Sequence, residues 1–227
     1  MRHSVRDKTI EYPDSDGRPM ADNTLQFQWI VTLKEGIEVL FRDDPDVFVA
    51  GDLLWYPVED NPDISIAPDV LVAFGRPQGY RGSYRQWMED GIAPQVVFEV
   101  RSPGNREPEM NRKLRFYDDY GVEEYYLYDP HRHTFAGWRR TNAGLEQIPD
   151  IDNWVSPRLG IRFELRGEVF TVIRSDGNRF LTFGEMDAER TLAEQERQQA
   201  LVQAEQAQQR AERLAAQLRA LGIEPEV

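Results

Sequence analysis

Two carboxylates occupy stretches that are otherwise typical of buried β-strands. Asp69 lies in "APDVLVAF" and Glu99 lies in "VVFEVRS". A charge in an apolar strand is costly unless it is paired or bound to a metal. If the two strands are neighbours, both carboxylates can converge on one oxygen-liganded cation, with waters and a phosphate completing its coordination. Such a cation stabilises charge on a phosphoryl group and lowers the pKa of a bound water, so the pattern predicts phosphoryl chemistry.

Strand geometry gives Glu99 a charged neighbour. Successive side chains of a strand point to opposite faces, so Glu99 and Arg101 share one face while Phe98 and Val100 point to the other. Two interpretations stay open at this point. The pair can be an ordinary ion pair on the wet side of a half-exposed strand, or Glu99 can be a metal ligand at a sheet edge.

A positive group that steadies a transition state has two candidates, Arg101 and Lys113. The guanidinium of Arg101 stays protonated, so it can supply electrostatic stabilisation only. Lys113 lies in the following helical segment, one turn before Tyr117, and could also take part in proton transfer. The alternative for Lys113 is an ordinary exposed helix lysine.

Composition restricts the kind of metal site. The chain has 227 residues and no cysteine, which excludes disulfides, thiol catalysis and cysteine-ligated clusters. Its only imidazoles are His3, His131 and His133, so a histidine-rich site is not expected. Any metal should therefore be a hard ion with oxygen ligands, Mg²⁺ or Mn²⁺.

The charge distribution indicates where nucleic acid could bind. A net charge of -13 argues against a protein that coats nucleic acid by global attraction. The segment 76–115 nevertheless carries eight basic residues against five acidic ones. Within it, the long connection 75–91 interleaves arginines with aromatics, and Arg81, Tyr84 and Arg85 are the predicted nucleic-acid contacts. The alternative is that the aromatic side chains anchor this loop to the core.

Hydrophobic periodicity predicts the elements that must position these residues. Residues 20–41 have helical spacing behind the possible caps Asp22, Asn23 and Thr24, and 108–121 form a second helix that ends at a glycine. Strand-like runs bounded by Gly, Pro and Asp cover 46–58, 64–74, 94–102, 122–130, 134–140 and parts of 159–175. This order predicts an α/β fold with a mixed sheet flanked by helices. Within the fourth run, Glu123 and Glu124 are expected to be solvated.

The composition changes abruptly near residue 184, which predicts a domain over 1–183 and a helical tail over 184–227. In the tail, seven apolar residues step alternately by four and three, as in the seam of a coiled coil: Ala200, Ala204, Ala207, Ala211, Leu214, Leu218 and Leu221. We expect a homodimer, parallel or antiparallel, through this tail. A single solvated helix that docks on its own core is the alternative.

Taken together, five stretches resemble the Uma-type endonucleases of the PD-(D/E)XK, or restriction-endonuclease-like, superfamily. They are "APDVLVAFGRP", "GSYRQW", "APQVVFEVRSPGN", "EMNRKLRFYDDYGVEEYYLYDP" and "LGIRFE". The likeness covers the chain from about Met20 to the closing strands, and the heptad-like tail is typical of one branch. As a combination these motifs are specific, whereas a bare Pro-Asp followed by Glu-X-Lys would be weak.

The resemblance implies a restriction-endonuclease-like core with a metal site. It makes Asp69 the aspartate of the first motif and Glu99 the acid of the second. The usual lysine position, two residues after that acid, holds Arg101 here, and Lys113 matches a lysine that many relatives carry on the next helix. Two further acids are possible additions, Glu38 on the first helix and Asp52 before the first metal strand, although solvation is the simpler expectation for each.

The expected function is hydrolysis of DNA phosphodiester bonds by a Mg²⁺- or Mn²⁺-dependent endonuclease. The alternative is a nuclease-fold protein, weak or inactive as a catalyst, that acts as an interaction module through its coiled-coil tail. No run approaches the roughly 18 apolar residues of a membrane span, and "MRHSVRDKTI" lacks the apolar stretch of a secretion signal. A cytoplasmic protein without a membrane partner is expected.

Overall fold

The computed structural model describes residues 10–17 and 19–220. The chain divides into two compact units, Met1–Phe180 and Leu181–Val227, and each is described by itself. His3 and the last predicted seam residue, Leu221, lie outside the described residues. No helix within the described ranges combines the length and the apolar composition that a membrane crossing needs.

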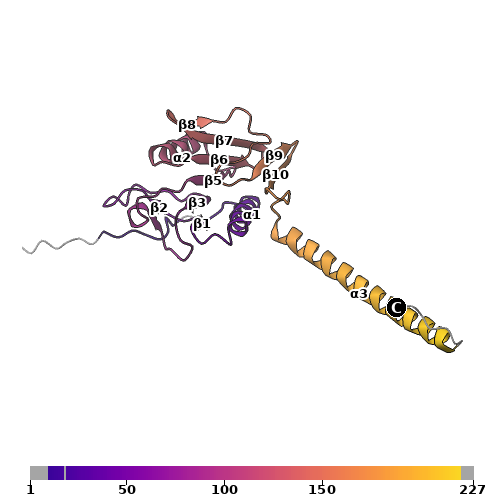
Figure 1. The fold of residues 1–227 in the computed structure, drawn as a ribbon. Coiled ribbons are helices and arrows are strands. Elements are labelled where there is room, and N and C mark those ends of the chain that lie inside the picture. The colour runs from indigo at the N-terminus through magenta and orange to yellow at the C-terminus, as the bar shows by residue number, and fades with distance from the viewer. Residues whose placement is uncertain (1–9, 18, 221–227) are drawn as a thin grey trace, which may run out of the picture. The chain divides into compact units, whose positions relative to one another are not determined.

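The first unit is built on a six-stranded sheet with the order β1-β3-β5-β6-β7-β8 (Figure 1). Its strands are β1 (Val47–Gly51), β3 (Val70–Phe74), β5 (Val96–Val100), β6 (Glu124–Asp129), β7 (Thr134–Thr141) and β8 (Gly144–Gln147). Strands β5 and β6 are parallel and every other neighbouring pair is antiparallel. A parallel pair needs a long crossover, which the helix α2 (Glu107–Asp119) supplies. The sheet is therefore mixed, as predicted.

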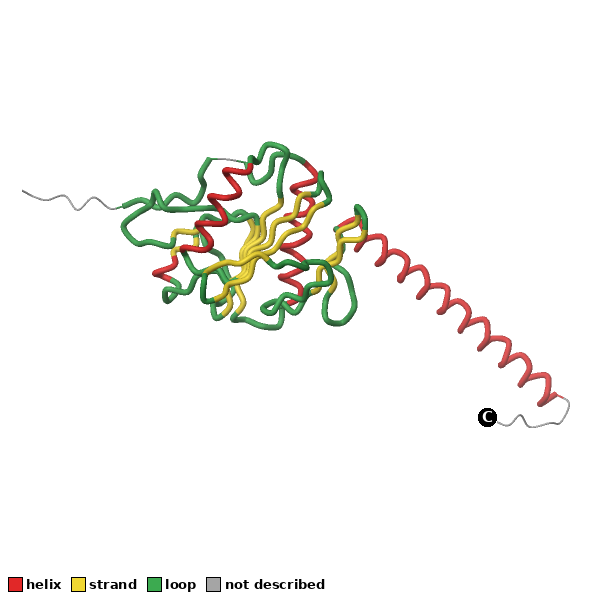
Figure 2. The backbone as a smooth tube through the Cα atoms, turned by 90° about the horizontal axis from the view of Figure 1, so that it is seen from above, coloured by secondary structure: helices red, strands yellow, loops and turns green. Residues whose placement is uncertain are grey.

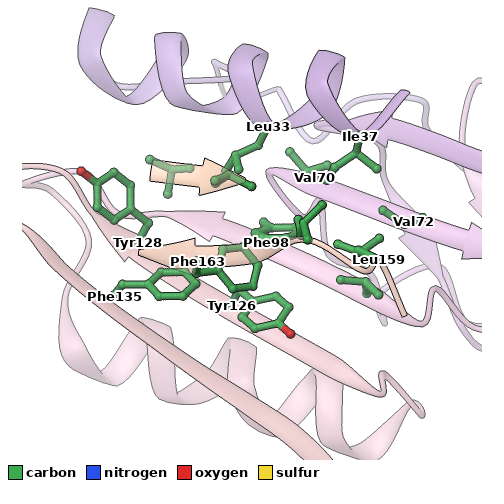
Figure 3. Packing of buried hydrophobic residues seen from close by; sticks show 14 of the residues in the cluster. Leu33, Ile37, Val70, Val72, Phe98, Tyr126, Tyr128, Phe135, Leu159 and Phe163 are labelled. Atoms are coloured by element: carbon green, nitrogen blue, oxygen red, sulfur yellow. The ribbon is translucent and has the colours of Figure 1, made fainter. Parts of the chain in front are cut away.

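Helices lie on either side of this sheet, as the view in Figure 2 shows. One face is covered by α1 (Thr24–Leu40) and by the hairpin of β9 (Arg162–Arg166) and β10 (Val169–Ile173). Helix α1 begins after Asn23, whose side chain accepts a hydrogen bond of 2.9 Å from the Gln26 amide. Figure 3 shows Leu33 and Ile37 packed over the sheet in this layer.

The opposite face carries α2 and a small parallel pair, β2 (Trp55–Tyr56) and β4 (Tyr84–Arg85), followed by a short 3₁₀ helix, η1 (Gln86–Met88). Trp55 is fully buried here, and its ring stacks parallel to that of Tyr117 with a centroid distance of 6.5 Å. The long connection 75–91 is therefore ordered by its own secondary structure, which the sequence reasoning did not predict.

The two faces divide the residues of β5 as strand alternation predicts. Val96, Phe98 and Val100 belong to the cluster under α1, whereas Val97 belongs to the cluster under α2. Glu99 therefore points to the side of α2, where it contacts side chains of that helix. The layer between sheet and α2 is consequently the place where the predicted chemistry has to occur.

The second unit contains one long helix, α3 (Phe183–Ala220). It begins with a capping box: the Glu185 amide donates to the Thr182 hydroxyl over 3.3 Å, and the Glu185 carboxylate accepts from the Thr182 amide over 2.8 Å. The helix is 38 residues long and buries none of its own side chains. The expected fold class, a mixed sheet flanked by helices with a long C-terminal helix, is thus confirmed.

Candidate active site

Glu99 lies near the end of β5 and is the most deeply buried acid of the site, with 2% of its surface exposed. Lys113 of α2 donates a hydrogen bond of 2.6 Å from Nζ to its Oε2. The Tyr117 hydroxyl, one turn further along the helix, donates to Oε1. Lys113 and Tyr117 are four residues apart and so share one helix face. Helix α2 therefore supplies both donors that compensate the buried carboxylate.

Asp69 precedes β3 and comes to Glu99 through strand pairing. Val70 pairs with Phe98 in antiparallel register, so the next position along each strand places Asp69 opposite Glu99. The Asp69 carboxylate accepts a hydrogen bond of 2.6 Å from the Val100 amide and is 8% exposed. The structure thus brings together the two acids, far apart in the sequence, that the predicted metal site requires.

The electrostatics show that Asp69 is held at a cost. Burial raises its pKa well above the ordinary value, and the neighbouring Glu99 carboxylate raises it further, against the opposing effect of Lys113. For Lys113, burial lowers the pKa, but the carboxylates of Glu99 and Asp69 outweigh burial and leave its pKa raised. Lys113 is therefore an ammonium ion at neutral pH.

Asp52 lies beside Asp69 because the predicted strand around it is interrupted. The run 46–58 was predicted as one strand, but β1 ends at Gly51 and β2 begins only at Trp55. In the interruption between the two strands, Asp52 adopts a left-handed backbone conformation with φ of 49°, and its amide donates a hydrogen bond of 3.3 Å to the Asp69 carbonyl. Burial raises the pKa of its carboxyl, as do the charges of Asp16 and Glu99. Asp52 is therefore a member of the site.

These side chains line a cavity of about 640 Å³. Its wall includes Asp69, Glu99 and Lys113 together with four other acids, which are Asp16, Asp22, Asp52 and Glu109. Gln26 of α1 also lines it, and its side-chain amide donates a hydrogen bond of 2.8 Å to the Val100 carbonyl. The cavity is consequently strongly acidic, with Lys113 beside its most buried acids.

Arg101 does not share this cavity. Its guanidinium lies 2.6 Å from the Glu107 carboxylate at the start of α2 and 3.9 Å from that of Asp129. It also donates to the Asn105 carbonyl. Although Arg101 follows Glu99 on the same side of the strand, β5 ends at Val100, and the side chain turns toward the loop and the helix start. The structure thus places Lys113, and not Arg101, at the Glu99 carboxylate.

Glu38 also lies elsewhere. Its carboxylate is 2.6 Å from the Lys34 ammonium, one turn earlier on α1, and half of its side chain is exposed. It lines a separate cavity of about 230 Å³ with Phe41 and Val47. The structure does not bring Glu38 to Asp69 and Glu99.

The three predicted nucleic-acid contacts in the connection 75–91, Arg81, Tyr84 and Arg85, do not line the acidic cavity and differ from one another in their contacts. Tyr84 has no exposed surface and donates its hydroxyl to the Ile92 carbonyl over 2.8 Å. A ring without exposed surface cannot stack on a base, so Tyr84 anchors the loop, as the alternative interpretation had it. Arg81 is 2.6 Å from the Glu89 carboxylate. Arg85 lies over the Tyr12 ring, 4.9 Å from its centroid.

The sequence did not lead us to predict roles for Tyr117 and Tyr125 at this site. The helical spacing from Lys113 to Tyr117 was visible in the sequence, and it could have assigned the Tyr117 hydroxyl to Glu99. The ring of Tyr125 in β6 packs against that of Tyr117 with a centroid distance of 5.0 Å, and its buried hydroxyl has no hydrogen-bond partner among the described residues. Burial raises its pKa well above the ordinary value, and the charges of Glu99 and Asp69 add to this. No pattern in the sequence distinguishes it from its strand neighbours.

The donor set has the chemistry of a hard-cation site. Carboxylate oxygens are the ligands that Mg²⁺ and Mn²⁺ prefer, and Asp69 and Glu99 present them from adjacent strands. Within residues 10–17 and 19–220, no three His, Cys, Asp or Glu side chains cluster closely enough to hold an ion alone. Asp69 and Glu99 would therefore have to share an ion with water or substrate oxygens, as Mg²⁺ sites commonly do.

Comparison with known proteins finds a family model and solved structures that are similar to this chain. Residues 6–169 match the model of the Uma2 family, described as "Putative restriction endonuclease". A crystal structure of "a putative nuclease belonging to DUF820" from Anabaena variabilis has 16% sequence identity and a TM-score of 0.47. The similarity covers 63% of this chain and 77% of that one. Comparison with curated proteins finds no match.

Proposed function

Because the chain belongs to the Uma2 family, we propose that it is a divalent-metal-dependent endonuclease that hydrolyses phosphodiester bonds in DNA. The observation that carries the proposal is the cluster of Asp69, Glu99 and Lys113 at the wall of one cavity. Two carboxylates and one ammonium leave an excess of negative charge in a buried place. A divalent cation between the carboxylates would offset that charge. The pKa of Asp69 is raised first by burial and then by the neighbouring Glu99 carboxylate, and both effects make a cation at this place favourable.

The residues divide into ligands and supporting groups. Asp69 and Glu99 would hold Mg²⁺ or Mn²⁺, which when bound polarises a phosphoryl oxygen and activates water. The Val100 amide and the Tyr117 hydroxyl fix the orientation of the two carboxylates, as hydrogen-bonded neighbours of metal ligands do.

Lys113 has a role set by its protonation. Its raised pKa keeps it an ammonium at neutral pH, so it cannot accept a proton from water. It can donate hydrogen bonds and place a positive charge beside the phosphate as negative charge develops there. Arg101, tied to Glu107 and Asp129, is the weaker candidate for this part.

The acidic wall of the cavity implies an order of binding. Asp16, Asp22, Asp52 and Glu109 surround the cluster and would repel a phosphate that approaches without cations. We therefore expect DNA to bind productively only after the divalent ion. Arg85 is a candidate for a contact to the DNA backbone outside the cavity, since phosphate contacts need only a reachable positive charge. Arg81, the other predicted contact, is a weaker candidate, because its side chain is only 13% exposed and is already paired with the Glu89 carboxylate.

The direct test is cleavage of supercoiled plasmid and of single-stranded DNA by the full chain, with Mg²⁺, Mn²⁺ or EDTA. We expect cleavage that requires the divalent ion and is lost in Asp69→Asn and Glu99→Gln. Glu38→Gln is the matched control, because it also removes one carboxylate from the first unit but lies outside the cavity. It should cleave like the unmodified protein.

Calorimetric titration with the metal separates the proposal from its alternative. Binding of Mg²⁺ or Mn²⁺ by the unmodified chain, abolished in both site variants, supports the nuclease. Cleavage that both variants retain would show a contaminating nuclease. Absence of both cleavage and metal binding at millimolar metal would contradict the proposal and favour an interaction module that keeps the fold without the chemistry.

A further inference from the structure

Helix α3 carries a heptad pattern over its whole described length. Counting back from the alanine and leucine seam, the core a and d positions are Phe183, Met186, Arg190, Ala193, Arg197, Ala200, Ala204, Ala207, Ala211, Leu214 and Leu218. The helix by itself buries none of these side chains. An apolar stripe of this length needs a partner, because isolated helices gain most of their stability from packing. We propose that α3 pairs with α3 of a second copy as an antiparallel coiled coil.

The two arginines in the seam decide against a parallel pair. In a parallel coiled coil, identical a positions face each other, so Arg190 would meet Arg190 and Arg197 would meet Arg197 in the core. Two layers of facing guanidiniums would be desolvated without any counter-charge. An in-register parallel homodimer cannot avoid this arrangement, because both copies have the same sequence.

An antiparallel pair removes this conflict. There each a position faces a d position of the other copy, and aligning the full length of both helices pairs residues whose numbers add to about 404. Arg190 then lies against Leu214 of the second copy, and Arg197 lies against Ala207. The small alanine leaves room for the arginine stem to run along the seam and carry its charge to water. Near the ends, Met186 packs against Leu218, where the largest apolar side chains can meet.

The charges that flank the seam give the same direction. In a parallel pair, each g position lies beside the following e position, which brings Glu189 next to Glu194 of the second copy. In the antiparallel pair, g positions face each other, and Glu196 comes beside Arg210. The repulsive pair of the parallel arrangement is thus absent, and an attractive Glu196–Arg210 pair forms instead. The two-fold symmetry of the dimer gives two such pairs.

The two halves of α3 are also complementary in net charge. Residues 183–200 contain five acids and two arginines, whereas residues 201–220 contain two acids and three arginines. Antiparallel alignment sets the acidic half of one helix against the basic half of the other. Parallel alignment sets the two acidic halves together. Complementary charge contributes more to the relative orientation of two partners than to their affinity. This charge asymmetry therefore favours the antiparallel arrangement.

The orientation also sets the distance between the two points at which the first units are attached. Each nuclease unit is joined to the amino end of its own α3, so an antiparallel dimer places the two attachment points at opposite ends. A helix of 38 residues at 1.5 Å per residue separates these points by about 57 Å.

Disulfide trapping tests the orientation in the full chain, which has no native cysteine to interfere. We expect Met186→Cys alone and Leu218→Cys alone to give no disulfide-linked dimer. An equimolar mixture of the two, exchanged before oxidation, should give a linked dimer of mixed composition. In a parallel pair each single variant would link to itself, because identical core positions would face each other. Self-linking of the single variants would overturn the proposal.

Charge exchange gives an independent measurement that does not depend on cysteine geometry. Glu196→Arg and Arg210→Glu should each raise the dimer Kd by about tenfold, because each places like charges together on both sides of the axis. The double variant carries the exchanged pair and should return to within about threefold of the original. Sedimentation equilibrium measures each Kd. A mass that stays monomeric at every concentration, or a double variant no better than the singles, would also overturn the proposal. None of these readouts requires nuclease activity.

Discussion

Lys113 crosses from α2 to β5 and lies 2.6 Å from the carboxylate of Glu99. The pair is largely buried, with 19% of the lysine side chain and 3% of the glutamate side chain exposed. The cation at the Glu99 carboxylate therefore comes from the helix. Arg101, two residues after Glu99 in the sequence, instead lies 2.6 Å from the Glu107 carboxylate and 3.9 Å from that of Asp129.

Lys113→Met should lower kcat by about 10²–10³-fold with little change in DNA affinity, because the lost charge acts mainly on the transition state. Arg101→Met, which removes a neighbouring cation outside the cavity, should stay within about threefold. Single-turnover cleavage of a labelled duplex at saturating enzyme measures both. If Arg101→Met is as damaging as Lys113→Met, the assignment of the two cations is wrong.

The same substitution tests the energetics of the buried pair. Lys113→Met leaves Glu99 without its counter-charge and should cost about 2–4 kcal/mol in the free energy of unfolding. The double variant Lys113→Met/Glu99→Gln should recover most of that stability but no activity. Urea unfolding of all three proteins measures the difference. A double variant as unstable as the single would show that the pair is not the source of the loss.

The metal-free protein should lose stability as pH rises, because of Asp69. Burial and Glu99 raise its pKa in the folded state above the unfolded value of 3.8. Between those two pKa values the folded chain binds a proton that the unfolded chain has released, so the free energy of unfolding decreases with increasing pH. The contribution is fully present below the unfolded pKa and is lost as pH passes through the folded pKa.

Thermal unfolding in EDTA at several pH values between 4 and 8 measures this effect. Asp69→Asn keeps an acceptor for the Val100 amide but cannot ionise, so its stability should depend less on pH and exceed that of the unmodified protein at neutral pH. Saturating Mg²⁺ should reverse the order, because binding to the folded state stabilises the unmodified protein only. Identical pH profiles for the two proteins in EDTA would contradict the account.

The sequence predicted the parts of the site that depend on strand and helix periodicity. Alternation along β5 gave the face of Glu99, and the apolar contexts of Asp69 and Glu99 marked both as unusual acids. Lys113 was one of two candidates for the cation, and the family resemblance matched it to a lysine that many relatives carry on this helix. Pairing of β3 with β5 was assumed for chemical reasons, and nothing local in either strand specifies the partner strand or the register.

Tertiary contacts account for the errors. Asp52 was expected to be solvated, but a left-handed turn directly after β1 places it at the cavity, where its amide donates a hydrogen bond to the Asp69 carbonyl just before β3. Tyr84 was assigned to nucleic acid because its loop looked exposed, and the pairing of β2 with β4 buries it. Arg101 shares the side of Glu99 only as long as the strand continues, and β5 stops one residue before it.

Glu124 illustrates a buried acid without a catalytic assignment. It was expected to be solvated but is 2% exposed. Its carboxylate accepts hydrogen bonds from the Tyr126 hydroxyl over 2.9 Å, from the Arg158 amide over 2.8 Å, and from the Ser156 hydroxyl. The Ser156 and Arg158 donors join β6 to the segment before β9, so Glu124 is a structural acid.

Glu124→Ala should therefore cost about 3 kcal/mol in the free energy of unfolding, because three donors lose a buried acceptor. Cleavage per folded molecule should stay unchanged. Chemical denaturation and the plasmid assay on the same preparation measure the two quantities. Loss of activity at full stability would mean that the segment 154–158 contributes to the site, which contradicts a purely structural role.

Tyr117 and Tyr125 provide a matched pair of hydroxyl deletions with opposite expectations. The Tyr117 hydroxyl donates to Glu99, whereas the buried Tyr125 hydroxyl has no partner among the described residues. Tyr117→Phe should destabilise the protein by about 1–2 kcal/mol and weaken metal binding about tenfold or more, because Glu99 loses a donor that orients it. Tyr125→Phe removes an unsatisfied polar group without changing the ring, so stability should be unchanged or higher.

Urea unfolding with calorimetric metal titration measures both effects. A Tyr125→Phe variant that loses as much stability as Tyr117→Phe would show that its hydroxyl is satisfied in solution and belongs to the same hydrogen-bond network.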